Sequence, residues 1–132
     1  MEKTYKDAAK SGLSARLPEI ETFENQFKNY KITISIPEFT SLCPKTGNPD
    51  FGSIIIEYQP DKRTIELKSL KTYIQSYRNL PIFYENSINL ILRDILKACK
   101  PVWVKVKGEF KPRGGISSVI EACYPPKINE SH

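Results

Sequence analysis

The sequence has little histidine and few cysteines, the residues that most often supply catalytic imidazoles, metal ligands and disulfides. Its single histidine is the last residue, His132, which excludes Ser-His-Asp and Cys-His mechanisms and any catalytic metal held by histidine. Its cysteines are an odd number without a CxxC pair, so neither a closed disulfide framework nor a structural zinc site is indicated. We therefore predict no bound metal and at least one free thiol among Cys43, Cys99 and Cys123.

Long apolar runs are also absent. No stretch approaches the roughly 20 apolar residues that span a bilayer, and the first residues, MEKTYKDAAKSG, lack the apolar centre of a signal peptide. The sequence also lacks a GxGxxG motif, so a Rossmann turn would not hold a dinucleotide. The expectation is a soluble cytoplasmic protein without a membrane partner.

The residues that are present suit one small basic domain. Of the 132 residues, 39% are hydrophobic, which is enough for a single core. Twenty Lys and Arg against fifteen Asp and Glu give a net charge of +5, which favours anionic partners such as phosphates, nucleotides or RNA. Charge alone does not choose among these partners.

Hydrophobic periodicity predicts an α+β fold. Ile32, Ile34 and Ile36 alternate with polar residues, which is typical of a half-buried strand, and Pro37 is expected to end it. The predicted order is strand, strand, helix, helix, strand, strand, over residues 30–37, 53–59, 70–77, 81–100, 102–107 and 115–124. Two hairpins flanking a helix pair predict a four-stranded, mostly antiparallel sheet with both helices on one face.

Cys43 is the candidate nucleophile, because it lies in a predicted loop of about fifteen residues and away from any apolar stripe. A surface thiol of no consequence is the alternative, whereas Cys99 and Cys123 fall in patterned segments and are assigned to packing. Asp50 follows across a turn that could fold its carboxyl back toward the thiol to transfer protons. An ordinary Asx-turn explains the same aspartate.

Basic side chains gather on and after the first predicted helix. Lys68 and Lys71 lie three residues apart and share a helix face, with Arg78 further along and Arg113 in a later turn. Such a cluster can bind phosphates through point charges and bidentate guanidinium contacts. A solvated helix face is the alternative for the two lysines.

The order and the amino-acid sequences of four segments show a resemblance to a known family. The segments are FTSLCPKTGNPDFG, ELKSLKTYIQSYRN, FYEN and GEFKPRGGIS. Together, from about Glu38 to Gly115, they resemble the NADPH-dependent 7-cyano-7-deazaguanine reductases, the nitrile reductases of queuosine biosynthesis, in their single-module form. The resemblance implies a tunnelling fold (T-fold) whose subunits close into a ring, with two pentameric rings stacked. Active sites of this family lie between subunits, so the KPRGG turn and the cysteine loop are expected to meet across an interface.

The resemblance also implies a mechanism. Cys43 would add as a thiolate to the nitrile carbon and form a covalent thioimide, while Asp50 protonates the nitrogen. NADPH would then supply hydride in two steps, giving the aminomethyl product. Further matched positions imply contacts with the substrate 7-cyano-7-deazaguanine from Glu85, Tyr84 and Glu66, and contacts with NADPH from Lys68, Lys71, Arg113 and Ser69.

One position departs from the family pattern. The family reads Phe-His-Glu where this chain has tyrosine at position 84, between Phe83 and Glu85. A phenol can donate a hydrogen bond, but with an ordinary pKa near 10 it does not serve as a cation at neutral pH.

Residues 1–27 are polar and weakly patterned, so we expect an N-terminal extension there, followed by a reductase domain at 28–126 and a C-terminal tail at 127–132. Two other functions fit the same fold. One is a transferase that adds ammonia or an amine to a nitrile carried on tRNA without NADPH. The other is a non-catalytic ring that binds a purine-like ligand or RNA. The ELKSLK segment favours reduction over transfer, and no direct contact with nucleic acid is expected of a reductase.

Overall fold

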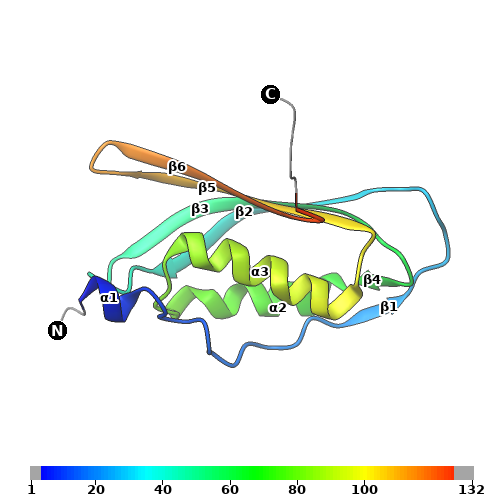
Figure 1. The fold of residues 1–132 in the computed structure, drawn as a ribbon, viewed down its shortest axis with the longest axis horizontal. Helices are drawn as coiled ribbons and strands as arrows, with labels where there is room; N and C mark the ends of the chain where they lie inside the picture. Colours follow the sequence, from blue (N-terminus) through cyan, green and yellow to red (C-terminus); the bar gives the residue numbers. More distant parts are fainter. Residues whose placement is uncertain (1–3, 127–132) are drawn as a thin grey trace.

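Four long strands form one antiparallel sheet, and two helices cover one of its faces (Figure 1). The strand order is β2-β3-β5-β6, comprising Ile32–Leu42, Pro49–Gln59, Trp103–Arg113 and Ile116–Tyr124. The covering helices are α2 (Leu67–Gln75), which continues into the short 3-10 helix η1 (Ser76–Asn79), and α3 (Tyr84–Cys99). The computed structural model describes residues 4–126, so the predicted tail at 127–132, with His132, lies outside them. The predicted α+β architecture is confirmed.

The core lies between the sheet and the helices. On β3, Ile54, Ile56 and Tyr58 are fully buried, and Val104 and Val106 of β5 extend the same apolar face. The alternating apolar residues from which the strands were predicted are therefore those on the sheet face that packs on the helices. The helices contribute the residues that recur at helical spacing: Leu70, Tyr73, Ile74, Ile88, Ile91 and Ile95. No helix within residues 4–126 is long and apolar enough to cross a membrane.

Strand β2 does not end at Pro37, so this part of the prediction is wrong. The strand continues to Leu42, and its register with β3 shifts between Ile36 and Phe39. Proline is tolerated there because β2 is an edge strand and the bulge removes the need for a donated hydrogen bond. The predicted long loop is consequently reduced to residues 43–48.

The N-terminal segment packs on its own chain. Helix α1 (Tyr5–Ala8) is followed by the short strand β1 (Thr22–Glu24), which pairs antiparallel with β4 (Arg63–Ile65). Ile20 is buried in the main core, so the segment contributes to the core as well as covering its edge. Strands of three residues are too short to show a hydrophobic period, so no sequence pattern predicted this second sheet.

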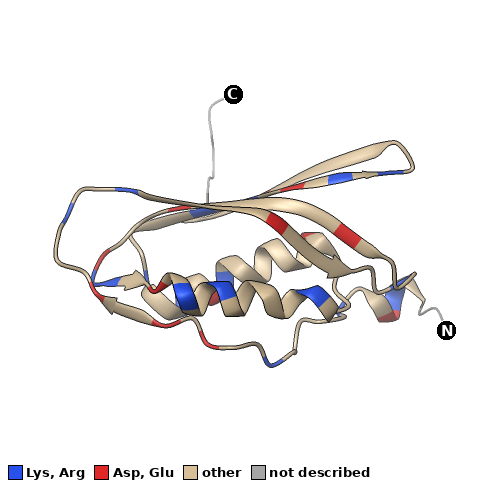
Figure 2. Ribbon diagram, turned by 180° about the vertical axis from the view of Figure 1, so that it is seen from behind, with Lys and Arg blue, Asp and Glu red and all other residues tan. Residues whose placement is uncertain are grey.

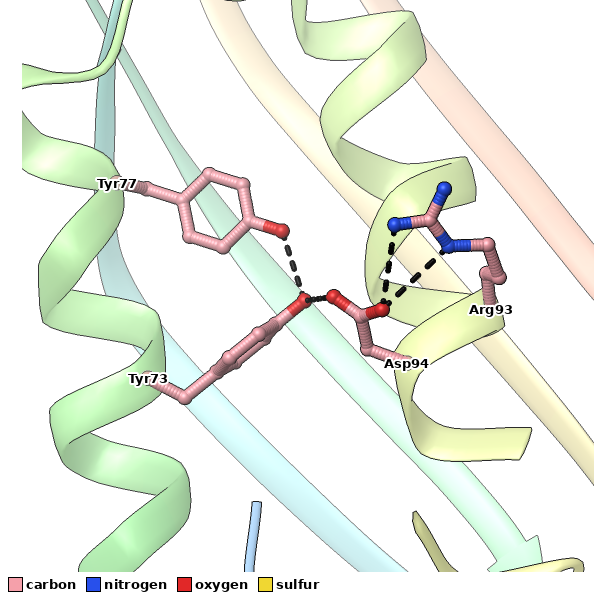
Figure 3. A network of polar contacts seen from close by, with 4 residues as sticks. All are labelled: Tyr73, Tyr77, Arg93 and Asp94. Atoms are coloured by element: carbon pink, nitrogen blue, oxygen red, sulfur yellow. Dashed lines mark hydrogen bonds and ion pairs between the residues drawn. The ribbon is translucent and has the colours of Figure 1, made fainter. Parts of the chain in front are cut away.

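A buried polar network joins the two covering helices (Figure 3). The Tyr73 hydroxyl donates to Asp94 Oδ2 over 2.5 Å and lies 2.8 Å from the Tyr77 hydroxyl, while Arg93 pairs with the same aspartate at 3.5 Å. Burial raises the pKa of both tyrosines far above the ordinary value, so both phenols stay protonated. The network fixes α2 and η1 against α3.

Replacing Tyr73 by phenylalanine is expected to destabilise the fold by about 1–3 kcal/mol, because Asp94 loses a buried donor. Tyr30→Phe is the matched control, since its hydroxyl bonds to Asn25 at an exposed site and its loss costs little. Urea unfolding measures both free energies. Equal losses in the two variants would contradict a stabilising role for the buried network.

Candidate active site

Cys43 opens a tight loop between β2 and β3. Its N–H donates to the Asn48 carbonyl over 2.8 Å, and its carbonyl accepts from the N–H of Gly47 over 2.7 Å. Gly47 has φ +79°, a left-handed conformation that favours glycine. The loop therefore closes on itself and presents Cys43 with its sulfur partly buried.

The environment of the thiol favours its ionised form. Partial burial is the largest effect and raises the pKa of Cys43, but hydrogen bonds from the Thr46 hydroxyl and from the N–H groups of Thr46 and Lys45 outweigh it. The charge of Asp50 opposes them. The net result is a pKa below the ordinary value for cysteine, which makes the nucleophilic thiolate more abundant near neutral pH. Thr46 was missed by sequence reasoning, although a hydroxyl residue one position before a turn glycine is a recognisable signal.

Thr46→Val is expected to slow alkylation of Cys43 by iodoacetamide at pH 7 several-fold, because loss of the hydroxyl raises the thiol pKa and lowers the thiolate fraction. The pH at which alkylation reaches half its maximal rate should move upward. Peptide mass mapping separates Cys43 from the half-buried Cys123. An unchanged pH profile would show that Thr46 does not stabilise the thiolate.

Asp50 lies on β3 directly opposite Ser41 of β2 and is only 4% exposed. Arg113 Nη1 donates to Asp50 Oδ1 over 2.5 Å. The hydrogen bond from Arg113 to Asp50 raises the pKa of the guanidinium, burial lowers it, and the charges of Asp50 and Cys43 raise it further. Arg113 therefore faces both the carboxylate and the thiol.

The contact between the KPRGG turn and the cysteine loop forms within one chain, so the expectation that they meet only across an interface is wrong. Gly52 pairs with Phe110 as the last β3–β5 pair, and extending that register by two residues sets Asp50 opposite the residue before Arg113. A bulge between Phe110 and Arg113 then turns the end of β5 toward Asp50.

The first turn of α3 is held next to the same loop. Leu42, the residue before Cys43, donates its N–H to the Leu80 carbonyl over 3.1 Å and accepts from the N–H of Ile82 over 2.9 Å. Tyr84 and Glu85 begin the helix directly after this attachment.

The two side chains differ in how they are held. The Tyr84 ring stacks on Phe110 at 4.2 Å between centroids, and its hydroxyl donates to Ser118 Oγ over 3.1 Å. Glu85 is exposed in the first turn, where the helix dipole favours a carboxylate. The phenol is thus fixed by packing, whereas the carboxylate is open to a ligand.

The remaining predicted site residues lie at the start of α2. Glu66 caps the helix, accepting from the N–H groups of Lys68 and Ser69, and these bonds lower its pKa. The Ser69 hydroxyl donates to the Glu66 carbonyl and accepts from the N–H of Glu21, so it ties the N-terminal segment to α2. Lys68 and Lys71 are exposed, and Figure 2 shows the basic residues along this side of α2.

One chain does not bring these α2 residues to Cys43. The cysteine loop precedes β3, whereas α2 follows the other end of β3 through β4. Eleven strand residues at about 3.3 Å each separate the two ends by roughly 35 Å. Figure 1 shows the same arrangement, with β4 and the start of α2 far from α1 and the β2–β3 turn. The site residues therefore form two groups: Cys43, Asp50, Tyr84, Glu85 and Arg113, and Glu66, Lys68, Ser69 and Lys71.

Comparison with known proteins places this chain in a family. A sequence model described as QueF-like protein matches residues 49–128. The NADPH-dependent 7-cyano-7-deazaguanine reductase of Elusimicrobium minutum is 57% identical over 92% of this chain and 93% of its own length. The enzyme of the same name from Chloroherpeton thalassium is 56% identical over 81% of this chain and 95% of its own length.

The fold has a counterpart among solved structures. The structure described as archaeosine synthase QueF-Like in the apo form superimposes with a TM-score of 0.68, covering 74% of this chain and 95% of that one. At 22% identity this likeness concerns the fold alone. The level of identity and the coverage of the two reductases establish that this chain belongs to the family of NADPH-dependent 7-cyano-7-deazaguanine reductases.

Proposed function

We propose that this chain reduces the nitrile of 7-cyano-7-deazaguanine to an aminomethyl group with NADPH, within queuosine tRNA modification. The observation that carries the proposal is the juxtaposition of a Cys43 thiol of lowered pKa with the buried Asp50 and with Arg113. A nitrile carbon is a weak electrophile toward hydride, so covalent activation by a thiolate makes reduction accessible.

The covalent step balances with the residues of this site. The Cys43 sulfur forms a bond to the nitrile carbon, and one π pair of the C≡N bond moves to nitrogen. Asp50 takes the proton that the Cys43 thiol releases, passes it to the nitrogen as the general acid, and ends as a carboxylate. The product is a thioimide, and no group leaves. The Asp50–Arg113 ion pair suits the carboxylate formed at the end of this step.

The substrate requires acceptors for the N–H groups of its guanine-like edge. Glu85 is an exposed carboxylate three residues beyond the segment attached to Leu42, and a carboxylate offers acceptors only. Tyr84 adds a phenol that can donate one hydrogen bond. Glu66 is proposed as a further substrate contact, supplied from the start of α2.

The residues present fit the phosphates of NADPH, which when bound supplies hydride. Lys68 and Lys71 are exposed ammonium groups on one helix face, and Arg113 is an exposed guanidinium at the hairpin turn. We propose that these cations bind the phosphates and that the capped helix start, with Ser69, fixes the position of the two lysines. Arg113 then exchanges its contact with Asp50 for one with a phosphate.

The separation of the two groups of site residues supports a shared site between subunits. β2 and β6 are the edges of the sheet, and an edge strand can pair with that of a neighbouring copy. Ile116 and Val119 on β6 are 73% and 59% exposed, and a neighbouring strand paired with β6 would cover part of each side chain. We therefore propose a homo-oligomer of stacked rings, in which α2 of one subunit completes the Cys43 site of another.

Loss of NADPH absorbance on addition of 7-cyano-7-deazaguanine tests this function. We expect two NADPH consumed for each aminomethyl product, identified by mass spectrometry. Omission of the nitrile substrate is the control for unproductive oxidation. A thioimide that forms while NADPH remains unconsumed would contradict reduction and favour transfer of an amine to the nitrile.

A further inference from the structure

Ser41 is a buried polar side chain without a partner, and it lies next to the candidate active site. It has 0% exposure, and its Oγ has no hydrogen-bond partner within residues 4–126. It is the residue paired with Asp50 across the β2–β3 ladder. Directly opposite residues of an antiparallel pair project from the same face, with Cβ atoms about 5 Å apart. The hydroxyl is therefore within reach of the Asp50 carboxyl.

A buried hydroxyl that lacks a partner costs stability, because it gives up its hydrogen bonds to water and gains none. Phe39, two residues earlier on the same face, packs its ring on Tyr77 and Phe110, so an apolar side chain suits this layer. The Ser41 hydroxyl therefore does not stabilise the fold in this conformation. Buried polar groups without hydrogen bonds are often found at functional sites, where another state of the protein supplies the missing hydrogen-bond partner.

The Asp50 carboxyl can supply the hydrogen-bond partner that the Ser41 hydroxyl lacks. Arg113 occupies Oδ1, and Oδ2 is the second acceptor of the same carboxyl. In the proposed mechanism the carboxyl gives up a proton while the thioimide forms, before NADPH is used, and Arg113 contacts only its Oδ1. The carboxylate that results needs a donor close to the protein core. A serine hydroxyl on the facing strand can donate without carrying charge into the buried layer.

We propose that Ser41 is a positioning residue for Asp50: its hydroxyl donates a hydrogen bond to Oδ2 as the carboxyl passes its proton to the substrate nitrogen. The proposal rests on the proposed function. Ser41 keeps its own proton throughout, and the one proton that moves passes from the Cys43 thiol through Asp50 to the nitrogen. The hydrogen bond orients the carboxyl before transfer and stabilises the carboxylate after it.

Ser41→Ala should slow thioimide formation without lowering the thermal stability of the protein. The variant removes a hydroxyl with no partner, so its thermal midpoint should equal or exceed that of the wild type. The rate of thioimide formation, followed by its absorbance without NADPH, should fall about tenfold through loss of carboxyl orientation. Substrate affinity, measured in a Cys43→Ala background, should stay unchanged. Ser41→Thr retains a hydroxyl and should recover most of the rate.

Ser87→Ala is the matched control for stability. Ser87 is also fully buried, but its hydroxyl donates to the Tyr84 carbonyl over 2.8 Å, so its loss should lower the thermal midpoint. A midpoint for Ser41→Ala that falls as far as that of Ser87→Ala would overturn the proposal. So would a wild-type rate of thioimide formation in Ser41→Ala. A wild-type chain that forms no thioimide would instead overturn the proposed function itself.

Discussion

Cys43→Ala is expected to abolish both thioimide formation and NADPH consumption. The thiolate is the only group of the site that can bond to the nitrile carbon, so no partial activity should remain above background. The variant should fold normally, because Cys43 lies in a loop whose closing hydrogen bonds come from the backbone. Stopped-flow absorbance measures the adduct, and NADPH absorbance measures turnover.

Cys99→Ala is the matched control for this substitution. Cys99 is 1% exposed in the core, and burial raises the pKa of its thiol to about 11, so it is unreactive near neutral pH. We expect a loss of about 1 kcal/mol in the free energy of unfolding, with turnover retained. Wild-type turnover in Cys43→Ala, or loss of the adduct in Cys99→Ala, would contradict the assignment of the nucleophile.

Asp50→Asn is expected to slow thioimide formation by about 10²–10⁴-fold, the usual contribution of a general acid. An amide of the same size keeps the packing but does not supply the proton. The negative charge of Asp50 raises the pKa of Cys43, so its removal should leave alkylation of Cys43 by iodoacetamide as fast or faster. If Asp50→Asn forms the thioimide more slowly while Cys43 is alkylated at least as fast as in the wild type, the variant lacks proton donation and not a reactive thiolate.

Glu109→Gln makes the same change of charge nearby on β5, at an exposed carboxylate whose distance to Lys107 is 4.0 Å. Its rate of thioimide formation should match the wild type. If Asp50→Asn and Glu109→Gln slow the adduct equally, Asp50 acts only through the overall charge of this end of the sheet.

Much of the fold could be predicted because its elements show clear hydrophobic periods. Ile54 and Ile56 belong to a strand of alternating burial, and Ile88, Ile91 and Ile95 belong to a helix stripe that faces the sheet. Pro37 misled the prediction, since the rule that proline ends a strand does not hold at a bulge on a sheet edge.

The candidate site was less accessible to sequence reasoning. The contact between Asp50 and Arg113 spans 63 residues and depends on strand register and a bulge, neither of which a local pattern specifies. Ser41 differs from other strand serines only by its burial and its lack of a partner, and both are properties of the packed chain. The family motifs indicated which residue types matter, while the register determined which of them meet.

The central claim is that the sulfur of Cys43 bonds to the nitrile carbon. Intact-protein mass spectrometry after addition of 7-cyano-7-deazaguanine, without NADPH, tests it most directly. We predict a mass increase equal to the whole substrate, because the addition expels no group, and we expect peptide mapping to place the added mass on Cys43. An unmodified protein under conditions where the substrate binds, or an adduct that maps to Cys123, would contradict the account.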